Sequence, residues 1–195
     1  LNAMKESATL GREKKVYSLS GLIGGDAYRL QQYSNSGKSL MGSGIVTAMA
    51  MAMSSSEVNG SMGKIVACPT AGSCGILPAA MASGAVVELM GGTPEMSLDA
   101  AAIIFKNVLG LVCDPVAGLV EIPCAKRNAA GAISALCTAD MVMAGVESKI
   151  PFDDTVSAMY KVGKSLPSSL RETAMGGVAI TKAGLELRKK VFGEE

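Results

Sequence analysis

The sequence predicts an all-α fold, a single compact helical domain over residues 1–195 whose Gly- and Pro-rich loops carry the functional groups. Runs of Val, Ile, Thr and aromatic residues in strict alternation, which are typical of strands, are scarce. Helix start and stop signals recur instead, and the hydrophobic residues between them have helical spacing. A chain of 195 residues can bury one sizeable core but is short for two domains.

The clearest helix begins after Thr93. This residue is a suitable N-cap, Pro94 fits the first helical position, Glu95 lies in the first turn, and Gly110 is a stop signal. Its expected inner face consists of Leu98, Ala101, Ala102, Phe105 and Leu109.

Four further helices are expected. An Ala- and Met-rich helix spans about 44–54, and a helix lined by small residues lies within 126–146. A third spans 151–166 with Asp153 as its cap, and a short one spans 167–176. The expected inner face of the third comprises Val156, Met159, Tyr160 and Gly163.

The composition excludes several classes of function. Lys plus Arg number 18 and Asp plus Glu 17, so the chain lacks the excess positive charge of a nucleic-acid binder. Aromatic residues make up 4%, too few for a platform that stacks bases. Because there is no histidine, any acid–base chemistry falls to Lys, Asp, Glu, Cys or Tyr, to a metal, or to a partner chain.

The sequence also argues against a membrane protein. The longest uncharged run, residues 65–87, is interrupted by several Pro and Gly residues, so we expect no membrane span. No N-terminal targeting signal is visible, which makes a reducing cytoplasm the default location. In that compartment five cysteines indicate metal binding, chemistry or packing more often than disulfides.

Two polar loops contain candidate binding groups. "ACPTAGSCGILP", residues 67–78, is a Gly-rich turn before an apolar helix and could bind an anion through its backbone N–H groups. A plain capping turn is the alternative. In "SGLIGGDA", two glycines allow close backbone approach to a ligand before Asp26, which could instead be a helix N-cap. The polar stretch 54–59, "SSSEVN", is predicted to be a solvent-facing helix end.

Cys113 and Cys124 flank an unusual loop, "CDPVAGLVEIPC". Their separation is too long for one metal knuckle but short enough for the loop to return to the same point. Pro115 and Pro123 stiffen the two ends. The spacing therefore leaves both a metal site and two buried cysteines open, whereas Cys137, within an Ala-rich helix, is expected in the core.

Five motifs occur in order: "SGLIGGDAY", "GKIVACPTAGSCGILPA", "VVELMGGTPE", "NVLGLVCDPVAGLVEIPCAKRNAAGA" and "SLPSSLRETAMGG". Together they resemble the α-chain of the iron–sulfur-dependent bacterial L-serine dehydratases, from about Ser18 to Gly184. The resemblance implies a lyase that converts L-serine into pyruvate and ammonia. It also implies a [4Fe-4S] cluster, held by three cysteine thiolates, with one iron open to act as a Lewis acid on the substrate.

The resemblance assigns Cys113 and Cys124 as two of the three cluster ligands. The family's third cysteine lies in a "GCQAE"-type stretch, and the resemblance implies that this stretch is absent at about Ala80–Met81. It also implies that a family segment is absent before Leu1. Either the internal stretch is deleted or a loop has been left out of the sequence. Two thiols alone are not expected to hold the cluster. Cys68 and Cys74 match a substrate-binding element rather than the third ligand.

The resemblance also implies the remaining site residues. Thr70, Ala71, Gly72 and Ser73 would bind the substrate carboxylate. Gly25 and Asp26 would lie near the amino group or the cluster, Arg127 and Asn128 would complete the pocket, and Lys126 is a candidate base.

A β-chain or β-domain, whose "SSSHT"-like motif is absent here, would complete the active site, so the chain alone should be inactive. A lyase or desulfidase acting on another β-substituted amino acid, a non-enzymatic metal-binding module, a membrane bundle and a homo-oligomer remain open.

Overall fold

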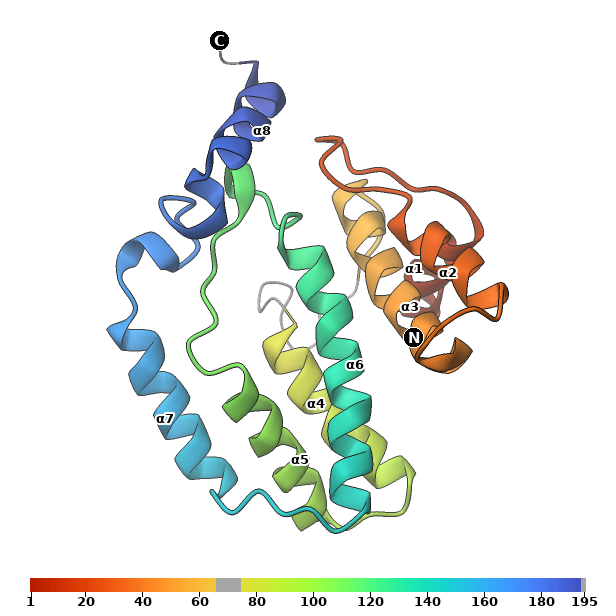
Figure 1. Cartoon of the computed structure of the whole chain (residues 1–195), viewed down its shortest axis with the longest axis vertical. Coiled ribbons are helices and arrows are strands. Elements are labelled where there is room, and N and C mark those ends of the chain that lie inside the picture. Colours follow the sequence, from red (N-terminus) through yellow and green to blue (C-terminus); the bar gives the residue numbers. More distant parts are fainter. Residues whose placement is uncertain (66–74, 194–195) are drawn as a thin grey trace.

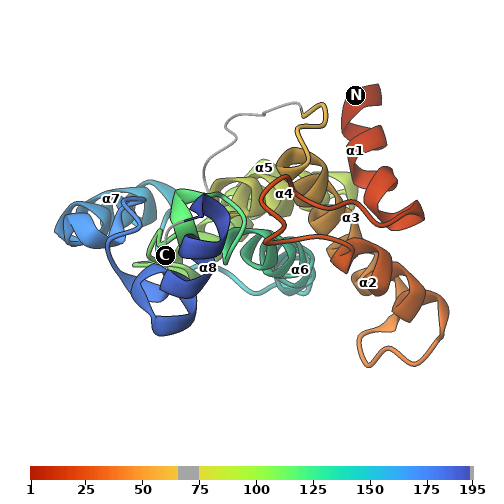
Figure 2. The same ribbon diagram turned by 90° about the horizontal axis from the view of Figure 1, so that it is seen from above.

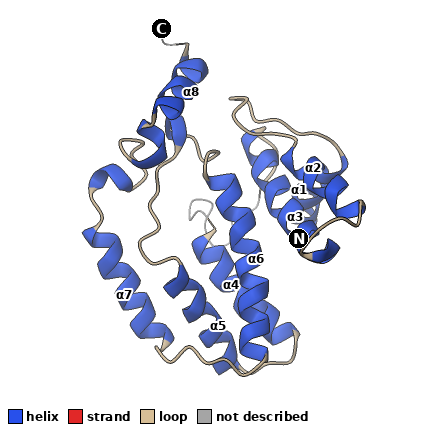
Figure 3. Cartoon of the chain, viewed as in Figure 1, coloured by secondary structure: helices blue, strands red, loops and turns tan. Residues whose placement is uncertain are grey.

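The computed structural model describes residues 1–65 and 75–193, and the regular elements within these ranges are helices (Figure 3). The α-helices are α1 (Asn2–Glu13), α2 (Asp26–Asn35), α3 (Gly42–Gly60), α4 (Ile76–Leu89), α5 (Pro94–Asn107), α6 (Cys124–Met143), α7 (Phe152–Ser165) and α8 (Lys182–Phe192). Short 3-10 helices, η1 (Val116–Gly118), η2 (Ser168–Leu170) and η3 (Gly177–Ile180), lie in the connecting segments. The predicted all-α fold is confirmed.

Helix α5 begins as its sequence predicts. The Thr93 side chain accepts a hydrogen bond from the Met96 N–H (3.3 Å), and Pro94 occupies the first helical position. Gly110, three residues past the helix end, has a φ of +77°, a conformation that favours glycine.

The predicted inner face of α5 is only partly correct. Ala102 and Phe105 are buried, but Leu98 is 51% exposed, while Ala100 and Ile104 are buried instead. Because α5 packs against α4, α6 and α7, its buried surface is wider than one stripe and shifted around the helix.

The other helices differ from prediction mainly at their ends. Helix α3 continues to Gly60, so the stretch 54–59 is helical rather than a helix end. Pro151, not Asp153, is the N-cap of α7, and Asp153 lies in the first turn. The stretch 167–176 contains η2, an isolated β-bridge between Arg171 and Cys113, and bends, because its backbone bonds to the neighbouring cysteine loop.

The inner face of α7 is also shifted. Thr155 is buried, and Met159 packs against the core as predicted, but Val156 and Tyr160 are 41% and 64% exposed. Helix α7 packs mainly against α5, so only a narrow stripe is covered. Cys137 is exposed rather than buried, because α6 turns Ala135, Thr138 and Ala139 inward.

The helices form two groups that meet along α3 and α6 (Figure 1). Helices α1, α2 and α3 make one group, and α4, α5 and α6 make the other, with α7 on its far side (Figure 2). The core where the groups meet contains Ile23, Ala27, Met53, Ala125 and Ala129. Two further core clusters lie among α4, α5, α6 and α7, so α6 is central to the molecule.

Within the described ranges, no helix has the length and apolar character needed to cross a bilayer.

Candidate functional site

The two cysteines of the predicted metal site lie where the loop after α5 enters α6. Cys124 is the first residue of α6 and is 1% exposed, and Cys113 is half-buried. The backbone of Cys113 is held by the segment after η2: its N–H donates to the Leu170 carbonyl (2.9 Å), and its carbonyl accepts from the Glu172 N–H (2.8 Å). Cys113 therefore has a fixed backbone, as expected of a residue that presents a ligand.

Arg127 connects the two cysteine segments. Its Nη1 donates to the carbonyl oxygen of Val112 (2.9 Å) and to Asp114 Oδ1 (2.9 Å), the residues on either side of Cys113. Because Arg127 follows Cys124 by one turn of α6, these bonds bring both cysteines to the same end of this helix. The sequence singled out the two cysteines, and the structure shows that Arg127 joins the two segments that carry them.

The glycine-rich loop of residues 18–25 lies against the cysteine loop. The hydroxyl of Ser20 lies 2.9 and 2.7 Å from the two carboxylate oxygens of Glu121, which is 7% exposed. Glu121 precedes Cys124 by three residues, so this contact ties the two loops together.

The other end of the glycine-rich loop is held by Glu57 of α3. Glu57 Oε1 accepts from the N–H groups of Asp26 (2.6 Å) and Ala27 (3.2 Å), which lie at the N-terminus of α2. No hydrogen-bond partner is present for Glu57 Oε2 among the described residues, although the side chain is fully buried. Burial raises the pKa of this carboxyl, while the two backbone bonds act in the opposite direction.

Asp26 and Lys126 form an ion pair outside these buried contacts. Lys126 Nζ lies 2.8 Å from Asp26 Oδ2, and Arg29 binds Oδ1. Partial burial acts to raise the pKa of Asp26, but the bonds and charges of Lys126 and Arg29 outweigh it and hold the pKa below its usual value. An ammonium group has only donor hydrogens, so in this state Lys126 cannot accept a proton.

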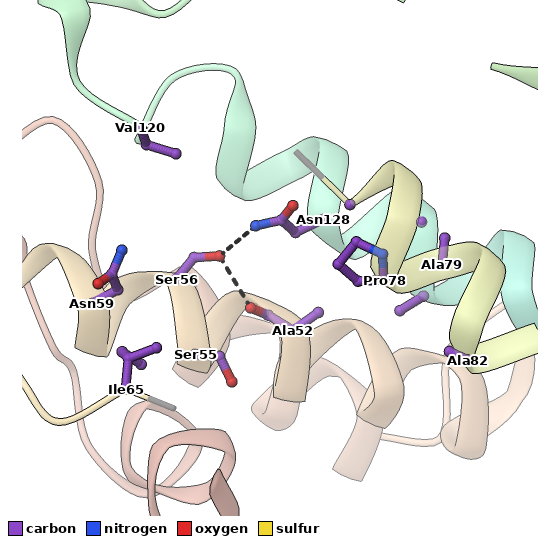
Figure 4. A pocket seen from close by; sticks show the side chains of 13 residues that line it. Ala52, Ser55, Ser56, Asn59, Ile65, Pro78, Ala79, Ala82, Val120 and Asn128 are labelled. Atoms are coloured by element: carbon purple, nitrogen blue, oxygen red, sulfur yellow. Dashed lines mark hydrogen bonds between the residues drawn. The ribbon is translucent and has the colours of Figure 1, made fainter. Parts of the chain in front are cut away.

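A cavity of about 310 Å³ lies where α3, α4 and α6 meet (Figure 4). Asn128 Nδ2 donates to Ser56 Oγ across the boundary between α6 and α3 (3.2 Å). The lining residues are Ala52, Ser55, Ser56, Asn59, Ile65, Gly75, Pro78, Ala79, Ala82, Val120, Asn128, Gly131 and Ala132. This lining combines an apolar floor with a few neutral polar groups, the usual composition of a site for a small molecule.

The structure separates residues that the sequence grouped together. Asn128 lines the cavity, whereas Arg127 is bound to Asp114 and is not part of the lining. Lys126 and Asp26 line a different hollow, on another face of α6, and Gly25 is the N-cap of α2. The predicted carboxylate-binding residues, Thr70, Ala71, Gly72 and Ser73, lie outside the described residues, as do Cys68 and Cys74.

Four side chains with central contacts were missed from the sequence: Ser56, Glu57, Asp114 and Glu121. The reading of "SSSEVN" as solvent-facing was wrong, because Ser54 and Glu57 are fully buried. The spacing Val46, Ala50, Ser54, Val58, with Glu57 on the same side, would have extended the inner face of α3 through this stretch. Asp114 and Glu121 gave no periodic signal because they lie in a loop.

Residues 1–65 and 75–193 contain no group of three or more acidic or cysteine side chains that could hold a metal ion. The metal-ligand role of Cys113 and Cys124 stays a prediction from the sequence.

Comparison with known proteins identifies the family. The sequence matches the family described as "Serine dehydratase alpha chain" over residues 1–81 and 79–179. It is 43% identical, over 99% of its length, to the probable L-serine dehydratase α chain of Bacillus subtilis, of which it covers 81%. It is 42% identical over its whole length to the L-serine dehydratase α chain of Peptoniphilus asaccharolyticus, of which it covers 84%.

A more distant relative is a longer protein. L-serine dehydratase TdcG of Escherichia coli is 31% identical over 66% of this chain, which covers 40% of that relative. The resemblance seen in the motifs is thus confirmed along most of the sequence. This chain belongs to the serine dehydratase α-chain family.

Proposed function

We propose that the chain is the catalytic α subunit of an L-serine ammonia-lyase, which converts L-serine into pyruvate and ammonia together with a β chain. The observation that carries this proposal is the similarity to two L-serine dehydratase α chains, of which the chain covers 81% and 84%. The name "alpha chain" of these relatives supports a β chain as partner. The cytoplasmic location stays a prediction from the sequence.

Cys113 and Cys124 are the proposed ligands of a [4Fe-4S] cluster. The residues present fit two of its ligand positions: both thiols belong to the same end of α6, one on a fixed loop backbone and one at the first helical position. When bound, the cluster supplies a Lewis-acidic iron that polarises the substrate hydroxyl. The chain's own contribution is to hold the two thiols and to bind and orient the amino acid.

The cavity among α3, α4 and α6 is the proposed site of the substrate. Asn128 and Ser56 offer hydrogen bonds to the polar groups of an amino acid, and the small residues opposite limit its size. Thr70, Ala71, Gly72 and Ser73 are proposed to bind the substrate carboxylate; Ile65 and Gly75, on either side of them in the sequence, both line this cavity.

Gly25 and Asp26 stay predicted to lie near the substrate amino group or the cluster, although Asp26 lines a different hollow from the proposed substrate cavity. The ion pair of Asp26 with Lys126 supports a role in orientation rather than in proton removal. Lys126, the candidate base from the sequence, is held in this ion pair. The base is therefore proposed to come from the β chain, because this chain contains no histidine.

A third cluster ligand is proposed to belong to a segment that the relatives contain and this sequence lacks. The alignments with the two α chains run over 244 and 245 positions, although this chain has only 195 residues. The family match is split into two parts that overlap at residues 79–81. Both observations support an interruption within α4, at the junction of Ala80 and Met81.

The test is to coexpress the chain with a β chain under anaerobic conditions, with and without the relatives' segment inserted at Ala80–Met81. L-serine turnover is followed by pyruvate formation, and a panel of β-substituted amino acids is tested beside it. We expect turnover only with both the β chain and the segment, and its loss in Cys113→Ser and Cys124→Ser.

Cys137→Ser is the matched control, because this cysteine is exposed on α6. Full activity of Cys113→Ser would overturn the ligand assignment, and turnover by the α chain alone would overturn the need for a β chain. If the enzyme prefers another amino acid of the panel, that amino acid and not L-serine is its substrate.

A further inference from the structure

The segment that carries Cys113 is held by Arg127, Asp114 and Gly177, which we call the clamp. Arg127 Nη1 uses two bonds of 2.9 Å to bind the residues immediately before and after this cysteine, Val112 and Asp114. These bonds join α6 to the loop that precedes it. A single guanidinium nitrogen thus fixes the short peptide segment that carries one thiol.

The other side of Asp114 is held by the segment after η2. Asp114 is 2% exposed, and its Oδ2 accepts a hydrogen bond from the Val178 N–H (2.7 Å). Gly177 lies so close that an added Cβ would overlap the Asp114 carboxylate. The φ of Gly177 is +59°, so a side chain here would also strain the backbone. Asp114 is therefore confined between α6 and the start of η3.

The energetics of this clamp indicate a role beyond stability. A buried ion pair contributes little net stability compared with apolar packing, because both charges lose their hydration. Its bonds are directional, however, and an arginine presents its donors in a fixed plane. Such a contact fixes the positions of the groups it joins more strictly than apolar packing would.

We propose that Arg127 and Asp114, with Gly177 behind them, are positioning residues that fix the Cys113 thiol relative to Cys124 for binding of the iron–sulfur cluster. This inference rests on the proposed ligand role of the two cysteines. Residues that orient metal ligands in this way typically change metal affinity about ten- to hundredfold when they are substituted. The role differs from the substrate contact that the sequence predicted for Arg127.

The test uses the assembled α–β enzyme, with the relatives' segment inserted at Ala80–Met81 and its cluster reconstituted anaerobically. Iron and sulfide content, the spectrum of the cluster and the rate of iron loss to a chelator are measured for three variants. Arg127→Lys keeps the charge without the planar donor group, Asp114→Asn keeps the shape without the charge, and Gly177→Ala displaces Asp114 without altering any charge. We expect iron loss to be about ten- to hundredfold faster in each.

Lys106→Met is the matched control. Lys106 Nζ donates to the carbonyl and hydroxyl oxygens of Ser148, so its removal also breaks partly buried bonds of a cation, but none to the residues that hold Cys113. The free energy of unfolding of each cluster-free variant is measured in parallel. Slow iron loss from Lys106→Met, at a stability matched to the clamp variants, would support the positioning role.

Two results would overturn the inference. One is iron retention like that of the unmodified enzyme in all three clamp variants while Cys113→Ser loses its cluster, which leaves the proposed function intact. The other is equally fast iron loss from Lys106→Met at matched stability, which would make the effect one of folding alone. Retention of the cluster in Cys113→Ser would overturn both the clamp and the ligand assignment.

Discussion

Buried carboxylates hold the loops around the candidate site. Glu57 is fully buried, Asp114 is 2% exposed and Glu121 is 7% exposed. Each accepts hydrogen bonds from a segment that is distant in sequence, and these donors compensate for part of the cost of burial. Glu57 Oε2 has no such donor among the described residues. At the scale of single residues, carboxylates of α3 and of the cysteine loop thus hold the surrounding loops in place by accepting their hydrogen bonds.

Glu57 should make stability depend on pH in a direction opposite to most acidic residues. Its folded-state pKa is raised by burial, so its stabilising contribution is complete below the ordinary pKa and is lost as pH rises through the folded value. We expect the advantage of the unmodified chain over Glu57→Gln to shrink as pH rises above the ordinary pKa of a glutamate.

Urea unfolding at several pH values measures this difference. Glu186→Gln, at an exposed position of α8, is the control and should give a difference that does not vary in this way. An advantage that grows with pH would mean that Glu57 is held as the anion, through its bonds to the N-terminus of α2.

Ser20 and Glu121 should be energetically coupled. Ser20→Ala removes the hydroxyl that contacts both oxygens of a nearly buried carboxylate, which should cost about 1–3 kcal/mol. In the Glu121→Gln background the same substitution should cost less, and a double-mutant cycle on unfolding free energies measures the difference. Ser134→Ala, which loses only a bond within α6, is the control. Additive effects would show that the two loops are not tied by this contact.

At the scale of elements, small residues allow the helices around the cavity to approach closely. Gly131 of α6 faces the start of α4, where an added Cβ would lie 3.0 Å from the Gly75 carbonyl oxygen and 3.4 Å from Ala79 Cβ. Both neighbours line the cavity, so the spacing of these two helices sets its width. The small side chains of Ala and Gly at these positions permit this packing.

Gly131→Ala should therefore separate α4 from α6. We expect a loss of about 1–3 kcal/mol in unfolding free energy, since a backbone oxygen cannot move aside as a flexible side chain can. Gly44→Ala is the matched control: it lies in α3 with nothing near the added Cβ, and should stabilise by roughly 0.5–1 kcal/mol. Similar effects of the two substitutions, measured by chemical unfolding, would contradict close packing at Gly131.

At the scale of the whole molecule, cohesion decreases from α6 outward. Helix α6 packs against α3, α4 and α5, whereas α7 packs mainly against α5, and α8 packs against η1 and η3 (Figure 1). The core clusters follow the same order, since α4, α5 and α6 contribute most of their residues. The end of the chain that carries α8 is therefore attached through η1 in the cysteine loop and through η3.

Hydrogen exchange should follow this gradient. Amides in the middle of α6 should exchange through global unfolding, and those of α8 through local opening, because few buried contacts hold α8. We expect protection at least tenfold lower in α8 than in α6, measured by mass spectrometry on the cluster-free chain. Equal protection of both helices would mean that the molecule unfolds as a single unit.

Much of the fold could be predicted from local signals in the sequence. The Thr93-Pro94 start of α5, the small-residue helix α6 and the Ala- and Met-rich helix α3 all formed where expected. Helix capping and periodicity depend on neighbours a few residues apart, so a single sequence contains them. The positions where helices end were harder to predict. Helix α3 continues to Gly60 because its last turns bond to other segments: Glu57 accepts from the Asp26 N–H, and the Gly60 carbonyl accepts from the Leu19 N–H.

The sequence by itself determined the helical class of this protein, the two cysteines that frame its loop, and the family to which it belongs. Only the tertiary structure decided that Arg127 bonds to the cysteine loop while Asn128 lines the cavity, and that Glu57 is buried. The physical reason is that neighbouring residues on a helix point about 100° apart, and their partners come from segments distant in sequence. Local patterns specify which elements form, but only packing specifies what each side chain meets.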